Sequence, residues 1–369
     1  MKKLARLMRF VIAVFVVMLA LPGAAQAAQE RGFQDWRAPG QPDFGVGTMR
    51  WLAIYPDDYR AVRDAVRWEL YQGYPDNTLR LFETQITRAE FATALCRALG
   101  HDPGPARGGA WWEPYTAWLG ERGILDPKSG DWNAPIPRWE MAAWCGRAVR
   151  AFEGEPQGGE LEFRDLGFLP EEVQRDIMTA AKAGVVVGED DYQGGRIFRP
   201  LVSSERVHAA LVLGRLVRVL KKNAPTVQQL CEIITALDAE QIEIEKAWDG
   251  KPNADGYLCP DYTPLREWGT ERYIRRVLVP EFAFRYGAYG RVLIPVEVKS
   301  EVVSAECYST VAKVVRRVHY QTVGQDGKPA FPGWEGFTVV LEHYFVLRDG
   351  KWLRTDDAQP EALSGGSGK

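Results

Sequence analysis

Three loosely similar segments between about Tyr55 and Leu220 limit what this chain can fold into. Each segment has an apolar helical pattern that ends at a glycine, an extended loop, and a second helical pattern. A period of about 50 residues is typical of repeat architectures, in which a unit buries its apolar face only against its neighbours. We therefore expect three helix–loop–helix units, at about 55–105, 106–155 and 160–220.

The first unit has the clearest local signals. Pro75-Asp76-Asn77 suits a tight turn. Thr87, followed three residues later by Glu90, forms a capping box that predicts the start of a helix. Thr87 and Glu90 therefore need no functional explanation.

Arginines at the starts of the second helices are harder to explain by structure alone. Arg88 and Arg138 occupy the first helical position, where a cation costs about a few tenths of a kcal/mol beside the positive end of the helix dipole. The placement suits an anion held by free backbone N–H groups and a guanidinium. In the third unit, counting from Phe198 gives Arg206 this position, whereas alignment on the apolar helix gives Ser204. A salt bridge to a neighbouring unit's carboxylate is the alternative explanation.

These motifs resemble the repeats of the S-layer homology (SLH) family, which read like G-Y-P-D-G-T-F-R-P followed by I-T-R-A-E-F. Residues 73–80 and 86–91 carry the resemblance in the first unit, and residues 163–165 and 197–200 carry it in the third. The second unit departs from the pattern, because Pro137 stands where a threonine would cap and the G-Y-P-D loop is missing.

The resemblance implies an all-α, three-repeat, pseudo-threefold module that holds secreted proteins to cell-wall glycans, often to a wall polymer with pyruvate ketals. It also implies that the repeated arginine contacts the anion, which ranks Arg88 first. The full set of candidate binding residues adds the other arginines and possible sugar contacts: Arg88, Arg138, Arg206, Tyr74, Asp76, Trp112 and Trp139.

The first 28 residues read as an export signal. A basic segment precedes an apolar run from Phe10 to Leu21, and Ala25-Gln26-Ala27 fits a cleavage site. The run holds about 12 residues, short of the ~20 that span a bilayer. Cleavage would leave a lead segment at 29–54 and a net charge of about −7, which argues against nucleic acid as the main partner.

Cysteine and histidine usage gives no support for a metal site or a cofactor. None of the five cysteines forms a C-x-x-C pair and the four histidines form no H-E-x-x-H motif. Cys96 and Cys145 lie in apolar helical patterns and are expected to be buried, while a Cys231–Cys259 bridge is possible but follows from no spacing rule. We expect neither a metal nor a cofactor.

The C-terminal part changes character after a polar linker at 221–225. Thr226 and Gln229 form a second capping box before a long amphipathic helix. Later β-branched runs, with Asp349-Gly350 between the last two, predict an antiparallel meander. This order resembles the NTF2-like, cone-shaped α+β family and predicts a domain at 226–358, followed by a flexible tail at 359–369.

The predicted fold class is therefore multidomain: an all-α SLH-like module followed by an NTF2-like α+β domain. The predicted function is a secreted, non-enzymatic protein of the cell wall or S-layer, anchored to an anionic polysaccharide, with a C-terminal domain that contacts a protein partner. One alternative is an envelope enzyme, for which His319, His343 and Asp261 are the candidate acid–base residues. Another is a spore-coat or assembly scaffold whose triplet makes only protein contacts.

Overall fold

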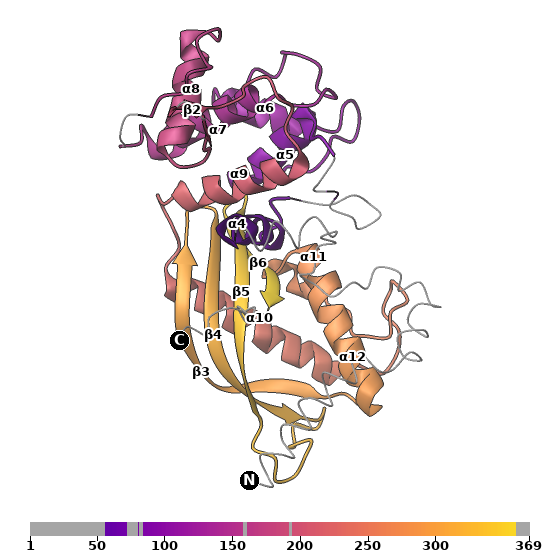
Figure 1. The fold of residues 1–369 in the computed structure, drawn as a ribbon. Helices are drawn as coiled ribbons and strands as arrows, with labels where there is room; N and C mark the ends of the chain where they lie inside the picture. The colour runs from indigo at the N-terminus through magenta and orange to yellow at the C-terminus, as the bar shows by residue number, and fades with distance from the viewer. Residues whose placement is uncertain (1–55, 72–79, 81–83, 158–160, 192–193, 359–369) are drawn as a thin grey trace, which may run out of the picture.

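The computed structural model describes residues 56–71, 80, 84–157, 161–191 and 194–358. Helices dominate the N-terminal part, and a four-stranded antiparallel sheet dominates the C-terminal part (Figure 1). The predicted signal peptide, lead segment and tail lie outside the described residues. Among the described helices, none combines the length and the apolar character that crossing a membrane requires.

Among the described residues, the N-terminal part contains three pairs of packed helices, and the last pair joins α9 (Arg206–Val219) to α4 (Pro56–Arg67). Its elements are α4 (Pro56–Arg67), α5 (Arg88–Ala98), α6 (Glu113–Glu121), α7 (Arg138–Glu153), α8 (Glu171–Lys182), β1 (Glu189–Asp190), β2 (Arg196–Ile197) and α9 (Arg206–Val219). The packed pairs are α5 with α6, α7 with α8, and α9 with α4. The last helix therefore returns to the first, and the capping box predicted at Thr87 and Glu90 is confirmed at the start of α5.

The three units meet at a set of backbone hydrogen bonds that we call the junction, centred on Ile86, Ile136 and Ser204. The N–H of Ile136 donates to the carbonyl of Ile86 (2.9 Å), that of Ser204 to Ile136 (3.0 Å), and that of Ile86 to Ser204 (3.0 Å). Each unit thus donates to one neighbour and accepts from the other. The junction gives the N-terminal part a pseudo-threefold centre.

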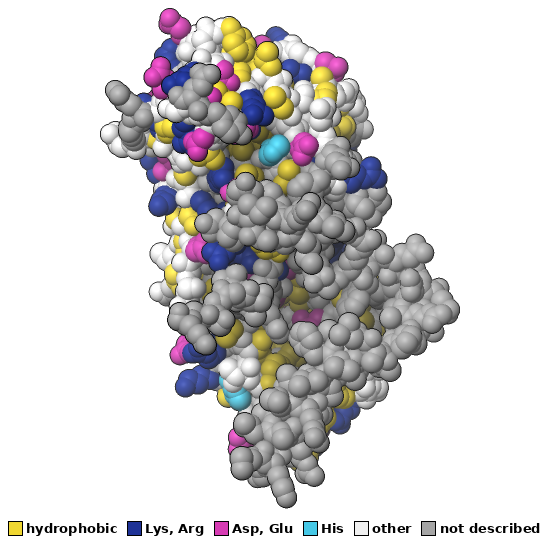
Figure 2. All heavy atoms as spheres, in the orientation of Figure 1, with side chains coloured by type: hydrophobic (Ala, Val, Ile, Leu, Met, Phe, Trp, Pro, Cys, Tyr) yellow, Lys and Arg dark blue, Asp and Glu magenta, His cyan; other side chains and the backbone are white. Residues whose placement is uncertain are grey.

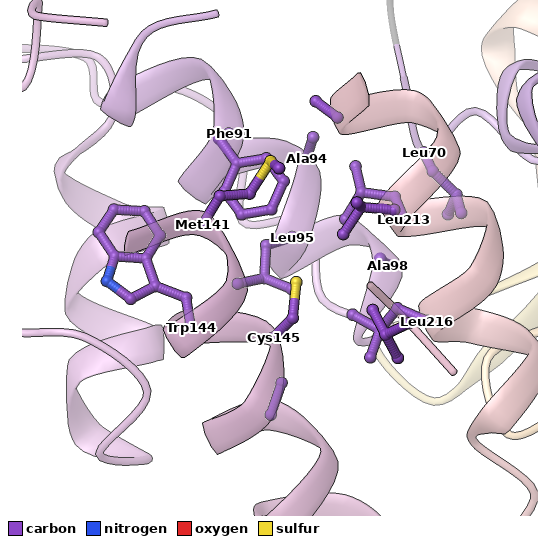
Figure 3. Packing of buried hydrophobic residues seen from close by; sticks show 14 of the residues in the cluster. Leu70, Phe91, Ala94, Leu95, Ala98, Met141, Trp144, Cys145, Leu213 and Leu216 are labelled. Atoms are coloured by element: carbon purple, nitrogen blue, oxygen red, sulfur yellow. The ribbon is translucent and has the colours of Figure 1, made fainter. Parts of the chain in front are cut away.

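A single hydrophobic core lies around the junction. Figure 3 shows side chains from α5, α7 and α9 pointing toward one another, among them Leu95, Met141 and Leu213, each at most 2% exposed. Cys96 and Cys145 are buried, as predicted, and the five cysteines are unpaired, so the possible Cys231–Cys259 bridge is not formed.

The C-terminal part is a long helix followed by short helices and an antiparallel meander. Its elements are α10 (Val227–Ala247), η1 (Thr263–Glu267), α11 (Glu271–Tyr273), η2 (Ile274–Leu278), α12 (Val279–Tyr289), β3 (Ile294–Cys307), β4 (Val311–Val323), β5 (Phe337–Arg348) and β6 (Lys351–Ala358). The strand order is β3-β4-β5-β6. Asp349 and Gly350 both have positive φ angles, 48° and 84°, and join β5 to β6 as their sequence predicts.

The helical part and the sheet share buried side chains. Val311, Tyr344 and Val346 of the sheet belong to the same core cluster as the helices of the N-terminal part. The indole N–H of Trp68 donates to the carbonyl of Ala312 (2.9 Å). In Figure 1, α4 and α9 lie at the end of the long strands, between the sheet and helices α5 to α8.

These observations correct the predicted fold class. The N-terminal part is not all-α, because β1 and β2 form an antiparallel sheet and the junction contains isolated β-bridges. Among the described residues, three from the four-stranded sheet are also buried in the cluster of the N-terminal helices, although the C-terminal part has two clusters of its own. The described chain is an α+β protein with its helices N-terminal and its main sheet C-terminal.

Candidate anion-binding site at three arginines

The junction places three arginines in equivalent positions. The backbone N–H of Arg88 donates to Ala134 (3.0 Å), that of Arg138 to Val202 (2.9 Å) and that of Arg206 to Thr84 (3.0 Å). Each arginine is the first residue of its helix and contacts the loop of the next unit. Arg206, and not Ser204, is therefore the third member, because Ser204 matches Ile86 and Ile136 in the junction.

The same contacts correct the expectation of free backbone donors at these helix starts. Besides the arginine N–H groups, the N–H of Ala89 donates to Trp132 and that of Trp139 donates to Pro200, both at 3.0 Å. Glu90 donates its N–H to the Thr87 hydroxyl (3.2 Å). Because these donors of α5 and α7 are used within the chain, an anion at Arg88 or Arg138 would have to be held by side chains.

Two of the arginines lie in close intramolecular ion pairs. Arg88 Nε is 2.5 Å from Glu140 Oε2, and the side chain of Arg88 is 18% exposed. Arg206 Nη1 is 2.6 Å from Glu90 Oε1, and its side chain is 4% exposed over the ring of Tyr71. A carboxylate already neutralises both cations, which argues against ranking Arg88 first.

Arg138 has a different environment from the other two. Its Nη2 donates to the carbonyl of Val187 (2.8 Å), and its guanidinium lies 4.9 Å from the centre of the Phe198 ring. Its closest ion-pair partner is Glu189, 3.9 Å away and 45% exposed, and the Arg138 side chain is 23% exposed. Burial lowers the pKa of Arg138, although Glu189 opposes that effect.

A substitution within the repeat explains the difference. Glu90 and Glu140, which pair with the arginines of the preceding units, each lie two residues after the arginine of their own unit. The equivalent residue of the third unit is His208, so α9 offers Arg138 no carboxylate there. Sequence reasoning missed His208, although the spacing from Arg206 could have revealed it.

The remaining predicted binding residues do not gather at one place. Tyr74 and Asp76 lie outside the described residues. Trp112 precedes α6 and makes an edge contact with Trp111, which the sequence reasoning missed and which is 41% exposed. Trp139 is partly buried against the helical core, next to Arg138. On the face in Figure 2, acidic and basic side chains are interspersed over the helical part.

The candidate acid–base residues of the C-terminal part have separate surroundings. Asp261 is exposed and accepts a hydrogen bond from the N–H of Thr263 (2.9 Å), and His319 contacts the Thr338 hydroxyl (3.0 Å). His343 is fully buried on β5, with Nδ1 2.8 Å from Asp357 Oδ1. Of the three, only His343 is paired with a carboxylate in the described structure.

Arg354 completes a buried group around His343. Its Nη2 is 2.9 Å from His343 Nδ1 and 2.6 Å from Asp357 Oδ2. Burial lowers the pKa of His343 and Arg354 lowers it further. Burial alone would raise the pKa of Asp357, but Arg354 and His343 hold it below its usual range. The Nε2 of His343 has no hydrogen-bond partner among the described residues.

Comparison with models of known protein families and with curated proteins found no match for this chain. Within the described residues, no group of three His, Cys, Asp or Glu side chains is placed to hold a metal ion. The geometry of the three arginines is therefore the main evidence on function.

Proposed function

We propose that the chain is a secreted cell-envelope protein that attaches non-covalently to an anionic cell-wall polysaccharide, with Arg138 as the contact to the acid group. The observation that carries this proposal is the unequal pairing of the three arginines. Arg88 and Arg206 are bound to carboxylates at 2.5 and 2.6 Å, whereas Arg138 is 3.9 Å from its closest carboxylate partner. The leader-like sequence at 1–28 supports an envelope location.

The chemistry of the Arg138 environment suits a sugar carboxylate. A guanidinium offers paired N–H donors in a planar fork that matches the two oxygens of a carboxylate. A pyruvate ketal on a wall sugar supplies such a group. The fully buried ring of Phe198 lies under the guanidinium and supports its position.

The paired arginines limit the number of sites. Binding an anion at Arg88 or Arg206 would require the ligand to displace Glu140 or Glu90 and leave that carboxylate without its partner. Removing one member of a hydrogen-bonded, partly buried charge pair costs about 1–3 kcal/mol. We therefore propose one binding site per chain, which implies weaker anchoring than three sites would give.

Co-sedimentation of the full chain with purified pyruvylated wall polysaccharide tests this proposal. Arg138→Gln should weaken binding by about 10-fold or more, because it removes charge-assisted hydrogen bonds to the carboxylate. Arg88→Gln is the matched control and should retain wild-type affinity. Wild-type affinity in the Arg138→Gln chain would contradict the proposed contact.

A second candidate function is an assembly scaffold, such as a spore-coat component. The observation in its favour is that two of the three arginines are used in intramolecular ion pairs, as expected if the helices serve only to hold the fold together. A scaffold should remain on cell envelopes after their polysaccharide is removed enzymatically. Loss of the chain from such envelopes would favour polysaccharide anchoring.

The proposal assigns the protein no catalytic activity, and one observation favours an enzyme instead. His343 is buried beside Asp357 and has an unpartnered Nε2, an arrangement that general bases use. Rapid modification of His343 by diethyl pyrocarbonate in the folded chain would support an enzyme. Protection of His343 until the chain unfolds would assign it a structural role.

A further inference from the structure

The third residue of α5, α7 and α9 differs in charge among the three units. Glu90 and Glu140 occupy this position in α5 and α7, and His208 occupies it in α9. Each of the two glutamates binds the arginine of the preceding unit, Arg206 and Arg88 respectively. If the same pairing held in the third unit, the partner of Arg138 would be His208.

We propose that His208 is the specificity-determining residue of the Arg138 site: it keeps the site open to anions at neutral pH and strengthens anion binding when it is protonated. The inference rests on the proposed function for the identity of the site, but the role it assigns to His208 can be tested separately. A glutamate at this position closes the equivalent sites by pairing with their arginines. Neutral histidine carries no charge that could compete with an incoming carboxylate.

The charges around His208 support both parts of the proposal. Arg138 from α7, Glu189 from β1 and Glu205, which precedes α9, act on its imidazole. Partial desolvation and Arg138 lower the pKa of His208, and Glu205 and Glu189 oppose that shift. Glu189 is itself paired with Arg199, at 3.0 Å. Asp165 accepts the backbone N–H groups of Phe198 and Arg199, at 2.8 and 2.7 Å. Two acids near Arg138, Glu189 and Asp165, are therefore engaged in contacts within the chain.

The direction of the pH effect follows from this arrangement. An anion bound between Arg138 and His208 favours the charged imidazole, so binding takes up a proton and affinity rises as pH falls. His208 is exposed, so the second charge contributes as surface charges do and should change affinity by about 2- to 5-fold. Glu189 and Glu205 raise the pKa of His208, but their own charges repel an incoming anion.

Titration of the full chain with free pyruvate, followed by NMR of arginine Nε–H and histidine ring signals, tests the inference without a polysaccharide. In the wild-type chain, pyruvate should shift the Arg138 and His208 signals and bind more tightly at pH 5.5 than at pH 7.5, by about 2- to 5-fold. His208→Gln should keep the affinity seen at the higher pH and lose the pH dependence.

Two exchanges of charge give the sharpest comparison. His208→Glu should close the Arg138 site and reduce pyruvate affinity by about 10-fold, because the ligand must displace a new ion pair. Glu140→His is the reciprocal change and should open a second site at Arg88, detected as shifts of the Arg88 signal and two pyruvate ions per chain. Circular dichroism melting curves establish that each variant is folded before titration.

The outcomes separate this inference from the proposed function. Wild-type affinity in the His208→Glu chain, pH dependence that persists in His208→Gln, or no pyruvate binding to the wild type would overturn the inference. If pyruvate binds as described but the pyruvylated polysaccharide does not, the role of His208 stands and the proposed wall anchoring fails.

Discussion

Replacement of Gly146 by alanine should separate two helices of the N-terminal part. A Cβ at this position of α7 would lie 1.9 Å from the carbonyl oxygen of Asp176 and 2.8 Å from its carbonyl carbon, both in α8. Because the clash is with backbone, no side-chain rotation relieves it. The helices would have to move apart by more than about 1 Å to reach an ordinary contact.

The expected cost combines overpacking with a weakened charge group. Overpacking costs about 1–3 kcal/mol. The movement would also lengthen the contact between Arg147 Nε and Asp176 Oδ2, now 2.6 Å, and the contact of Arg150 with the same buried carboxylate. Adding about 1–2 kcal/mol for those bonds gives a total of about 3–5 kcal/mol. For a chain of this size, the melting temperature should fall by about 10 °C.

Thermal and urea unfolding of the full chain measure this effect. Gly287→Ala is the matched control, because Gly287 lies in α12 and an added Cβ there meets nothing within 4 Å. Alanine should stabilise that helix by about 0.5–1 kcal/mol. If Gly146→Ala raises the melting temperature as Gly287→Ala does, the close approach of α7 and α8 is incorrect and the reasoning fails.

Two further predictions concern the contact between the helices and the sheet. Burial raises the pKa of Asp356 to about 6, so its charge destabilises the folded state as pH rises from about 4 to 7. In urea unfolding, the free energy of unfolding of Asp356→Asn should therefore gain up to about 3 kcal/mol relative to wild type over that range. The same difference between the two chains at about pH 4 and about pH 7 would contradict this. Trp68→Phe should lower stability by about 1–3 kcal/mol, because the carbonyl of Ala312 loses its buried donor; an unchanged urea midpoint would show that this bond contributes nothing.

Local chemistry made parts of the fold predictable. The capping boxes at Thr87 and Thr226 start helices as expected, because the cap and its third residue interact over a few bonds. The Asp349-Gly350 turn also follows from local preference, since both residues tolerate positive φ angles. The helix-to-strand change after about residue 290 was visible in β-branched runs.

Unlike the caps and the turn, the charge partners of the arginines could not be predicted from local sequence. Arg88 and Glu140 are 52 residues apart in sequence, and Arg206 and Glu90 are 116 apart. No local pattern distinguishes a glutamate that caps its own helix from one that also binds a distant arginine. The salt-bridge alternative was correct for two arginines. His208, at the position of Glu90 and Glu140, is the one sequence signal that marks Arg138 as the exception.

The return of α9 to α4 fixes the number of units. An added Cβ at Gly214 of α9 would lie 2.3 Å from the carbonyl oxygen of Ala61, and Arg218 contacts Asp64 at 2.5 Å, so α4 fills the place that a fourth unit would need. Solenoid proteins lengthen by inserting copies of their unit because their ends stay open. This chain has no such freedom, so its evolution by duplication would have stopped at three copies, and changes in its binding properties would have come from point substitutions within them.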